Sequence, residues 1–202
     1  MTRHKEQRVG IFIDVQNMYY SAKQLYNSKV NFNSILKEGV AGRKLIRAVA
    51  YAIKADIKEE SQFYDALEKI GFEVRLKNLQ IFFGGAKKGD WDIGLAMDVI
   101  RMSSKLDVVI LVSGDGDFKE MLEYVKANGC RAEVFAFSKT ASSKLKEEAD
   151  LFIDMGKDTR KFLIRGSIGR RKTLKKTAPP VRRTVQKPAP VKTAKPQSPP
   201  KL

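Results

Sequence analysis

The order of apolar and polar residues divides most of the chain into two alternating kinds of segment. Short apolar runs rich in β-branched residues are typical of buried parallel strands, whereas apolar residues three or four positions apart are typical of helices. Runs of the first kind cover residues 9–13, 46–53, 72–76, 108–112 and 131–137, with a short apolar segment at 151–153. Segments of the second kind follow them near residues 15–25, 59–70, 92–100, 118–125 and 141–149. The pattern therefore predicts strands and helices in alternation.

Alternation of this kind favours one architecture. Parallel strands joined by helical crossovers form a layered sheet with right-handed connections. We expect an α/β fold class, namely a Rossmann-like three-layer α/β/α arrangement with a mainly parallel central sheet. Neither an internal repeat nor a heptad pattern is apparent, so a solenoid and a coiled coil are not competing expectations.

Composition separates the end of the chain from the rest. All seven prolines lie from Pro179 onward, and residues 159–202 hold 14 of the 39 Lys and Arg residues and no Asp or Glu. The other 25 basic residues face all 23 acidic residues, so nearly the whole net charge of +16 belongs to the tail. A proline-rich segment with one sign of charge buries too little apolar surface to fold alone. We expect a folded domain at 1–158 and a basic, Pro-rich, disordered tail at 159–202.

The scarcity of some residue types limits the chemistry. Cys130 is the one cysteine and His4 the one histidine, so a disulfide, a Cys-rich zinc site and a His-dependent catalytic triad are not expected. The sequence shows no signal peptide and no run of roughly 20 apolar residues, which predicts a cytoplasmic protein without a membrane span. Any catalysis should then depend on carboxylates, lysines or a metal ion held by oxygen.

Carboxylates recur where predicted strands end. Asp14 follows the first strand and Asp115 follows the strand at 108–112, with Asp117 close behind, while Asp92 begins a helix. Asp98 lies among apolar residues of that helix, where an unpaired carboxylate would be costly. A single Asp in such a place is often only a helix cap. Several at the carboxyl edge of one parallel sheet, where ligands bind in open α/β folds, predict a site.

Grouped carboxylates predict a cation. Like charges a few ångströms apart raise at least one pKa unless a cation is present. Oxygen ligands without His or Cys suit Mg²⁺ or Mn²⁺, and Mg²⁺ commonly uses one or two carboxylates with waters and a substrate phosphate. Metal-assisted hydrolysis of a phosphodiester is the natural reaction for such a site.

Other α/β sites fit the residues less well. The Walker phosphate-binding loop is absent, and the third glycine of a dinucleotide fingerprint does not follow Gly114 and Gly116. A phosphatase of the haloacid dehalogenase type would require a second Asp at the position of Gln16.

Three segments together carry a resemblance to a known family: Ile13-Asp14-Val15-Gln16-Asn17, Lys88-Gly89-Asp90-Trp91-Asp92, and Ser113-Gly114-Asp115-Gly116-Asp117-Phe118. From Arg8 to Asp158 the chain resembles the NYN domain, LabA-like branch, of the PIN-like nuclease superfamily. The resemblance implies a metal-dependent ribonuclease whose acidic site consists of Asp14, Asp92, Asp115 and Asp117. It also implies polar positions at Asn17 and Ser113, and a position for Asp98 that either faces the metal or supports it from behind.

Basic residues suggest how the substrate would bind. Lys87 and Lys88, in a predicted loop at 84–89, are either phosphate contacts or simply solvated. Arg170, Arg171 and Lys172 of the tail would neutralise phosphates, giving sequence-independent and salt-dependent affinity. We expect a Mg²⁺- or Mn²⁺-dependent endoribonuclease with RNA as its partner. The alternative is a catalytically inactive nucleic-acid-binding or scaffold module, and nothing in the sequence indicates a homo-oligomer.

Overall fold

The structure is a computed structural model of the 202-residue chain. It describes residues 3–54, 58–78, 80–81, 87–88 and 91–164, without the side chains of 58–60, 80–81 and 87–88. The basic tail predicted at 159–202 therefore lies outside the described residues from 165 onward.

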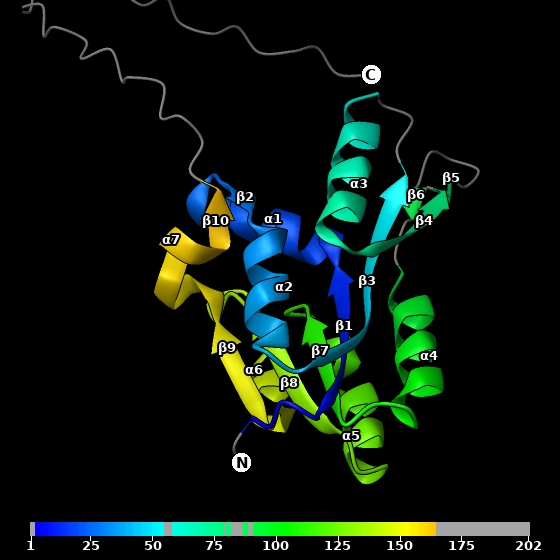
Figure 1. Ribbon diagram of the computed structural model, residues 1–202. Coiled ribbons are helices and arrows are strands. Elements are labelled where there is room, and N and C mark those ends of the chain that lie inside the picture. Colours follow the sequence, from blue (N-terminus) through cyan, green and yellow to red (C-terminus); the bar gives the residue numbers. More distant parts are fainter. Residues whose placement is uncertain (1–2, 55–57, 79, 82–86, 89–90, 165–202) are drawn as a thin grey trace, which may run out of the picture. The chain divides into compact units, whose positions relative to one another are not determined.

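A six-stranded parallel sheet forms the centre of the fold (Figure 1). Its strands are β1 (Arg8–Asp14), β3 (Lys44–Lys54), β4 (Glu73–Asn78), β7 (Val108–Val112), β8 (Arg131–Ala136) and β9 (Leu151–Asp154). They lie in the order β4-β3-β1-β7-β8-β9, and every neighbouring pair is parallel. Counted along the chain, this is the 3-2-1-4-5-6 order of doubly wound nucleotide-binding folds. The predicted α/β fold class is confirmed.

Helices cover both faces of the sheet. In Figure 1, α2 (Phe32–Val40) and α3 (Lys58–Ile70) lie in front, and α5 (Lys119–Ala127) and α6 (Ser143–Glu148) lie behind. The helix α1 (Val15–Tyr26) follows β1, and α4 (Asp92–Ser103) packs against α5. The connections change face when the chain passes from β4 to β7, as right-handed crossovers require when the strand order reverses.

Short elements complete the described part of the chain. They are β2 (Lys29–Val30) paired antiparallel with β10 (Leu163–Ile164), β5 (Gln80–Ile81) paired antiparallel with β6 (Lys87–Lys88), α7 (Thr159–Phe162), and the 3₁₀ turns η1 (Gly116–Phe118) and η2 (Met155–Asp158). The backbone of Lys87 and Lys88 is thus a strand within the segment predicted as a loop. Phe162 and Leu163, which follow the predicted domain boundary at Asp158, are buried in the core.

The helices α2 and α7 were not predicted. The helix α2 begins after Asn31, whose side chain accepts a hydrogen bond from the backbone N–H of Ser34 at 3.1 Å. Its inward residues are Phe32, Ile35 and Gly39, and a Cβ on Gly39 would approach Ile11 Cδ1 to 2.9 Å. The small residue lets the helix pack closely on β1.

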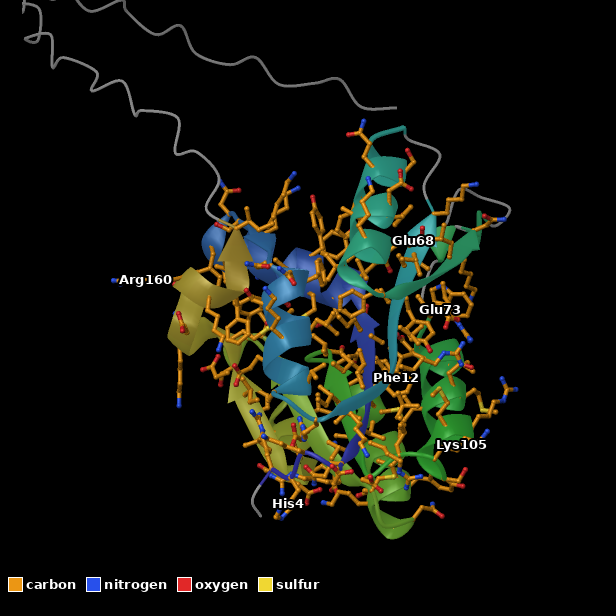
Figure 2. All side chains as sticks on the ribbon, viewed as in Figure 1. His4, Phe12, Glu68, Glu73, Lys105 and Arg160 are labelled. Carbon is orange, nitrogen blue, oxygen red and sulfur yellow. The ribbon has the colours of Figure 1, made fainter. Side chains whose placement is uncertain are left out.

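The two central strands supply the middle of the core. All five residues of β7 are buried, as are five of the seven in β1. Figure 2 shows the labelled Phe12 inside the body, whereas Glu68, Lys105 and Arg160 lie at its periphery. Because β1 and β7 are covered on both faces, the residues at their ends are held by a rigid support.

An ion pair is buried near the amino ends of the strands. Arg43 donates from Nη1 to Glu133 Oε1 at 3.0 Å and from Nη2 to Glu133 Oε2 at 2.9 Å. The side chain of Glu133 is 0% exposed and that of Arg43 1%. Arg43 also donates to the carbonyl of Gly39, and Arg131 donates to Glu133, so both charged groups are well satisfied.

In the described residues, no helix is long and apolar enough to cross a membrane.

Candidate functional site

The sheet order creates one place suited to a ligand. The chain runs from β1 to β3 and β4 on one side, then returns to β7 on the other side of β1. The carboxyl ends of β1 and β7 meet there, with Ile13 opposite Val112 in the register. In open α/β sheets, ligands bind outside the strands at this reversal point.

Asp14 ends β1 at the reversal point. One carboxylate oxygen, Oδ1, accepts a hydrogen bond from the backbone N–H of Asn17 at 3.0 Å and so caps α1. The other, Oδ2, accepts one from the hydroxyl of Ser113 at 3.2 Å. Asp14 therefore caps a helix and also contacts the loop after β7. A role as a helix cap is thus compatible with a place in a site at the edge of the sheet.

A small network joins the start of α1 to the loop after β7. The Ser113 hydroxyl oxygen accepts from the backbone N–H of Asp115 at 3.2 Å, and Asn17 Oδ1 accepts from that of Gly114 at 3.0 Å. A Cβ on Gly114 would lie 3.0 Å from Ala141 Cα, so the loop passes close to neighbouring backbone. Asn17 and Ser113, both predicted, thus hold the carboxylate of Asp14 and the backbone of the loop after β7 in place.

A pocket of about 200 Å³ opens beside this network, and we call it the acid pocket. Its lining residues are Asp14, Gln16, Asn17, Tyr20, Tyr51, Ile53, Trp91, Asp92 and Asp115. Three of the four acids predicted from the family resemblance therefore share one hollow: Asp14, Asp92 and Asp115.

Trp91 forms a fixed wall of the acid pocket. Its Nε1–H donates to the carbonyl of Ala52 at 3.0 Å, and its ring lies edge-on to Tyr51 with centroids 5.8 Å apart. A Cβ on Gly94 would come within 2.2 Å of the indole ring, so only glycine leaves room for it. Asp92, the first residue of α4, is positioned by this packing.

The electrostatics of Asp14 indicate an environment that disfavours its charge. Burial raises the pKa of its carboxyl, and the charge of Asp115 adds to this effect. Hydrogen bonds from Asn17 and Ser113 act in the opposite direction but do not cancel the increase in the pKa. A cation in the pocket would stabilise the ionised form.

The donors of the acid pocket fit a hard divalent cation. Carboxylate, amide and hydroxyl oxygens are available, with no sulfur or imidazole. As the side chains stand, no three Asp, Glu, His or Cys residues among those described are gathered closely enough to hold an ion. Side-chain movement or ligands from solvent would have to complete the coordination.

Two predicted acids lie outside the acid pocket. Asp117 is exposed and lines a neighbouring hollow of about 560 Å³ with Lys119, Ser142 and Lys144, while its backbone N–H donates to Asp115 Oδ1 at 3.1 Å. Asp98 forms an ion pair with Arg75 and accepts from the hydroxyl of Tyr51 at 2.9 Å. Since Tyr51 lines the pocket, Asp98 acts from behind its wall.

The remaining predicted contacts cannot be placed. The side chains of Lys87 and Lys88, and all of Arg170, Arg171 and Lys172, lie outside the described residues. His4 lies near the N-terminus, at the end of the body away from the carboxyl ends of the strands (Figure 2).

Sequence reasoning missed two residues of the pocket wall, Tyr51 and Ile53. Their signal was available, since positions two apart on a strand point to the same side and both lie near the end of β3. The predicted strand ended at Ile53, and it is followed directly by Lys54 rather than by a carboxylate such as those that mark the ends of β1 and β7.

Comparison with known proteins finds a matching family, a similar sequence and a similar structure. A model of the NYN domain family matches residues 8–156. Low amplitude and bright protein LabA of Synechococcus elongatus is 27% identical over 165 residues, covering 77% of this chain and 87% of LabA. The crystal structure of a protein of unknown function from Vibrio parahaemolyticus is 33% identical, with a TM-score of 0.74, covering 81% of this chain and all of that one.

Proposed function

Because the chain belongs to the NYN domain family of PIN-like nucleases, we propose that it is a divalent-metal-dependent ribonuclease acting through the acid pocket. The reaction would be hydrolysis of a phosphodiester bond of RNA.

One observation carries the proposal. Asp14, Asp92 and Asp115 come from three separate segments and line the same pocket, at the reversal point of the sheet. A fold gains no stability by bringing carboxylates together, because their repulsion and burial cost free energy. Such an arrangement is expected where a bound cation offsets the cost.

Each residue has a proposed role. Asp14, Asp92 and Asp115 would hold Mg²⁺ or Mn²⁺, which when bound polarises a phosphoryl oxygen and lowers the pKa of a water. Asn17 and Ser113 would fix the carboxylate of Asp14 through the hydrogen bonds described above. Asp117 would contribute from the adjacent hollow, and we assign Asp98 a supporting position because Arg75 and Tyr51 already hold it.

Basic residues would bind the rest of the substrate. We propose that Lys87 and Lys88 contact phosphates near the pocket. We also propose that the basic tail, with Arg170, Arg171 and Lys172, tethers RNA through counterion release.

Cleavage of labelled RNA by the full chain tests the proposal. We expect cleavage with Mn²⁺, none with EDTA, and losses of more than about 100-fold in Asp14→Asn and Asp115→Asn. Asp65→Asn, which makes the same chemical change on the exposed surface of α3, should keep full activity. Equal cleavage in every sample would identify a contaminant and refute the proposal.

The alternative, a catalytically inactive nucleic-acid-binding module, has its own support. In the described residues no complete set of metal ligands is preassembled, and most of the net charge lies in the tail. Removing residues 166–202 separates the two functions. A tether predicts weaker binding and a smaller salt dependence with cleavage of short RNA retained, whereas the alternative predicts the same loss of binding with no cleavage at any stage.

A further inference from the structure

We propose that Tyr20 is a stacking platform for a nucleobase, so that the acid pocket takes a single strand of nucleic acid with an unstacked base. The inference rests on the proposed function, because it names the form of the substrate that the same pocket would bind.

Tyr20 lies on the face of α1 that borders the acid pocket. It lies four residues after Gln16 and three after Asn17 on α1, and residues with these spacings share a helix face. All three line the acid pocket. The side chain of Tyr20 is nevertheless 62% exposed, so a large aromatic ring meets water at the edge of a pocket lined by carboxylates.

The other two aromatic residues of the pocket are held by hydrogen bonds within the fold, unlike Tyr20. The hydroxyl of Tyr51 donates to Asp98, and the indole N–H of Trp91 donates to the carbonyl of Ala52. Packing and hydrogen bonding within the fold account for both. In the described part of the chain, by contrast, the hydroxyl of Tyr20 makes no hydrogen bond, so the fold gives no comparable reason for its place.

The neighbouring ring of Tyr19 supports the ring of Tyr20. Tyr20 and Tyr19 make an edge-to-face contact with centroids 5.4 Å apart. Lys23 in turn lies 5.4 Å from the Tyr19 ring centroid and donates to its hydroxyl at 3.3 Å. These contacts restrict Tyr20 while leaving it exposed, which lowers the entropy cost of stacking on it.

An exposed aromatic ring favours an unpaired strand as the partner. Aromatic rings stack on nucleobases of any sequence, but the bases of a duplex stack on one another and must be unstacked before a side chain can reach a face. A pocket of about 200 Å³ suits one nucleotide rather than a helix. The favoured substrate is therefore a single strand.

Trp91 provides a local signal for the test. It is the one tryptophan of the chain and lines the acid pocket, so its fluorescence reports binding there rather than on the tail. The full chain would be titrated in Ca²⁺ with an unpaired RNA of about ten nucleotides. About 0.3 M KCl would weaken the contacts made by the tail. Electrophoresis would confirm that the RNA stays intact.

The expected result is a loss of about 5- to 100-fold in affinity for Tyr20→Ala. Tyr20→Phe should bind like the natural chain, because the ring does the stacking. Tyr124→Ala, which removes a 46% exposed tyrosine of α5 outside the pocket, is the matched control. An oligomer of abasic sugar phosphates should bind equally well to the natural chain and to Tyr20→Ala.

Three outcomes would overturn the inference: unchanged affinity in Tyr20→Ala, equal affinity for the duplex form of the same RNA, or no fluorescence response to RNA. None of them depends on turnover, whereas the proposed function is judged separately by cleavage in Mn²⁺. If the chain cleaves RNA but Tyr20→Ala leaves the affinity for RNA unchanged, the stacking platform is refuted and the proposed function stands.

Discussion

The ionised carboxylate of Asp14, which the proposed metal site requires, is unfavourable for the stability of the metal-free fold. Its pKa is raised by burial and by the charge of Asp115, so the ionised form is disfavoured in the folded chain. As pH rises above the pKa of an Asp in the unfolded chain, about 4, the unfolded state loses its proton first. The metal-free protein should therefore lose stability until the pH passes the pKa of Asp14 in the folded state, and should change no further through this group.

Asp14→Asn is expected to raise the melting temperature of the metal-free protein at neutral pH while abolishing cleavage. The amide removes a buried negative charge but still accepts a hydrogen bond to cap α1. Thermal melts across the acid range, with Asp65→Asn as the control, measure the effect. A lower melting temperature than that of the control at pH 7 would contradict this account.

Ser113→Ala should shift the acid limb of the pH–activity profile to higher pH. Its hydroxyl donates to Asp14 and so lowers the pKa of that carboxyl. Without this bond a larger fraction of Asp14 stays protonated at a given pH, and we expect activity near neutral pH to fall by about 10-fold. Ser103→Ala is the matched control, since that buried hydroxyl donates to the carbonyl of Ile100. Equal profiles for both variants would exclude the role.

The sequence predicted individual acids better than their partners. Asp14, Asp92 and Asp115 were predicted as site residues and share a pocket, although their binding of a metal stays a prediction. The partner of Asp98 is Arg75, 23 positions earlier on β4, and a single sequence gives no pattern that links them.

Among the elements, β3, β4 and α4 are joined behind the acid pocket. Asp98 of α4 binds Arg75 of β4 and the hydroxyl of Tyr51 of β3, and Arg75 also pairs with Glu73. Tyr51 in turn packs against Trp91. The wall of the pocket thus depends on charges that no substrate would touch.

Asp98→Asn distinguishes support from metal binding. As a supporting residue it should cost about 1–2 kcal/mol of stability, since the pair is partly exposed, and reduce activity about 10-fold. Tyr51→Phe should have a similar effect on activity because it removes one hydrogen bond to the same carboxylate. Urea unfolding and Mn²⁺ titration followed by Trp91 fluorescence give the two readings. If Asp98→Asn abolished Mn²⁺ binding while Tyr51→Phe preserved it, Asp98 would be a ligand.

Elements with strong periodicity were predicted closely, whereas the helix α2 and the two-residue strands were not. The six strands of the sheet and the long helices follow apolar patterns that burial on a layered fold demands. One of the three buried positions of the helix α2 is Gly39, which adds nothing to an apolar pattern, and the two-residue strands β2 and β10 are defined by pairing with each other across the chain. Tertiary contacts create such elements, so local pattern carries little trace of them.

For the molecule as a whole, the buried pair of Arg43 and Glu133 gives a testable prediction about stability. Glu133→Gln would leave the Arg43 charge buried without a full partner, so unfolding should become easier by about 3 kcal/mol. Glu123→Gln, which removes the exposed partner of Lys119, should leave the urea midpoint nearly unchanged. At urea concentrations too low to unfold the variant, Glu133→Gln should still cleave RNA, since Arg43 and Glu133 do not line the acid pocket. Equal midpoints in the two variants would refute the assignment.

The strand order also determines when the acid pocket can form during synthesis of the chain. The Ser113 hydroxyl that contacts Asp14 is separated from it by 99 positions, and β7 must pair with β1 before the two meet. A chain emerging from the ribosome therefore carries Asp14 long before Asp92 and Asp115 have been synthesised. Until β7 has been synthesised and has paired with β1, the centre that we propose for RNA cleavage is not assembled on the nascent polypeptide.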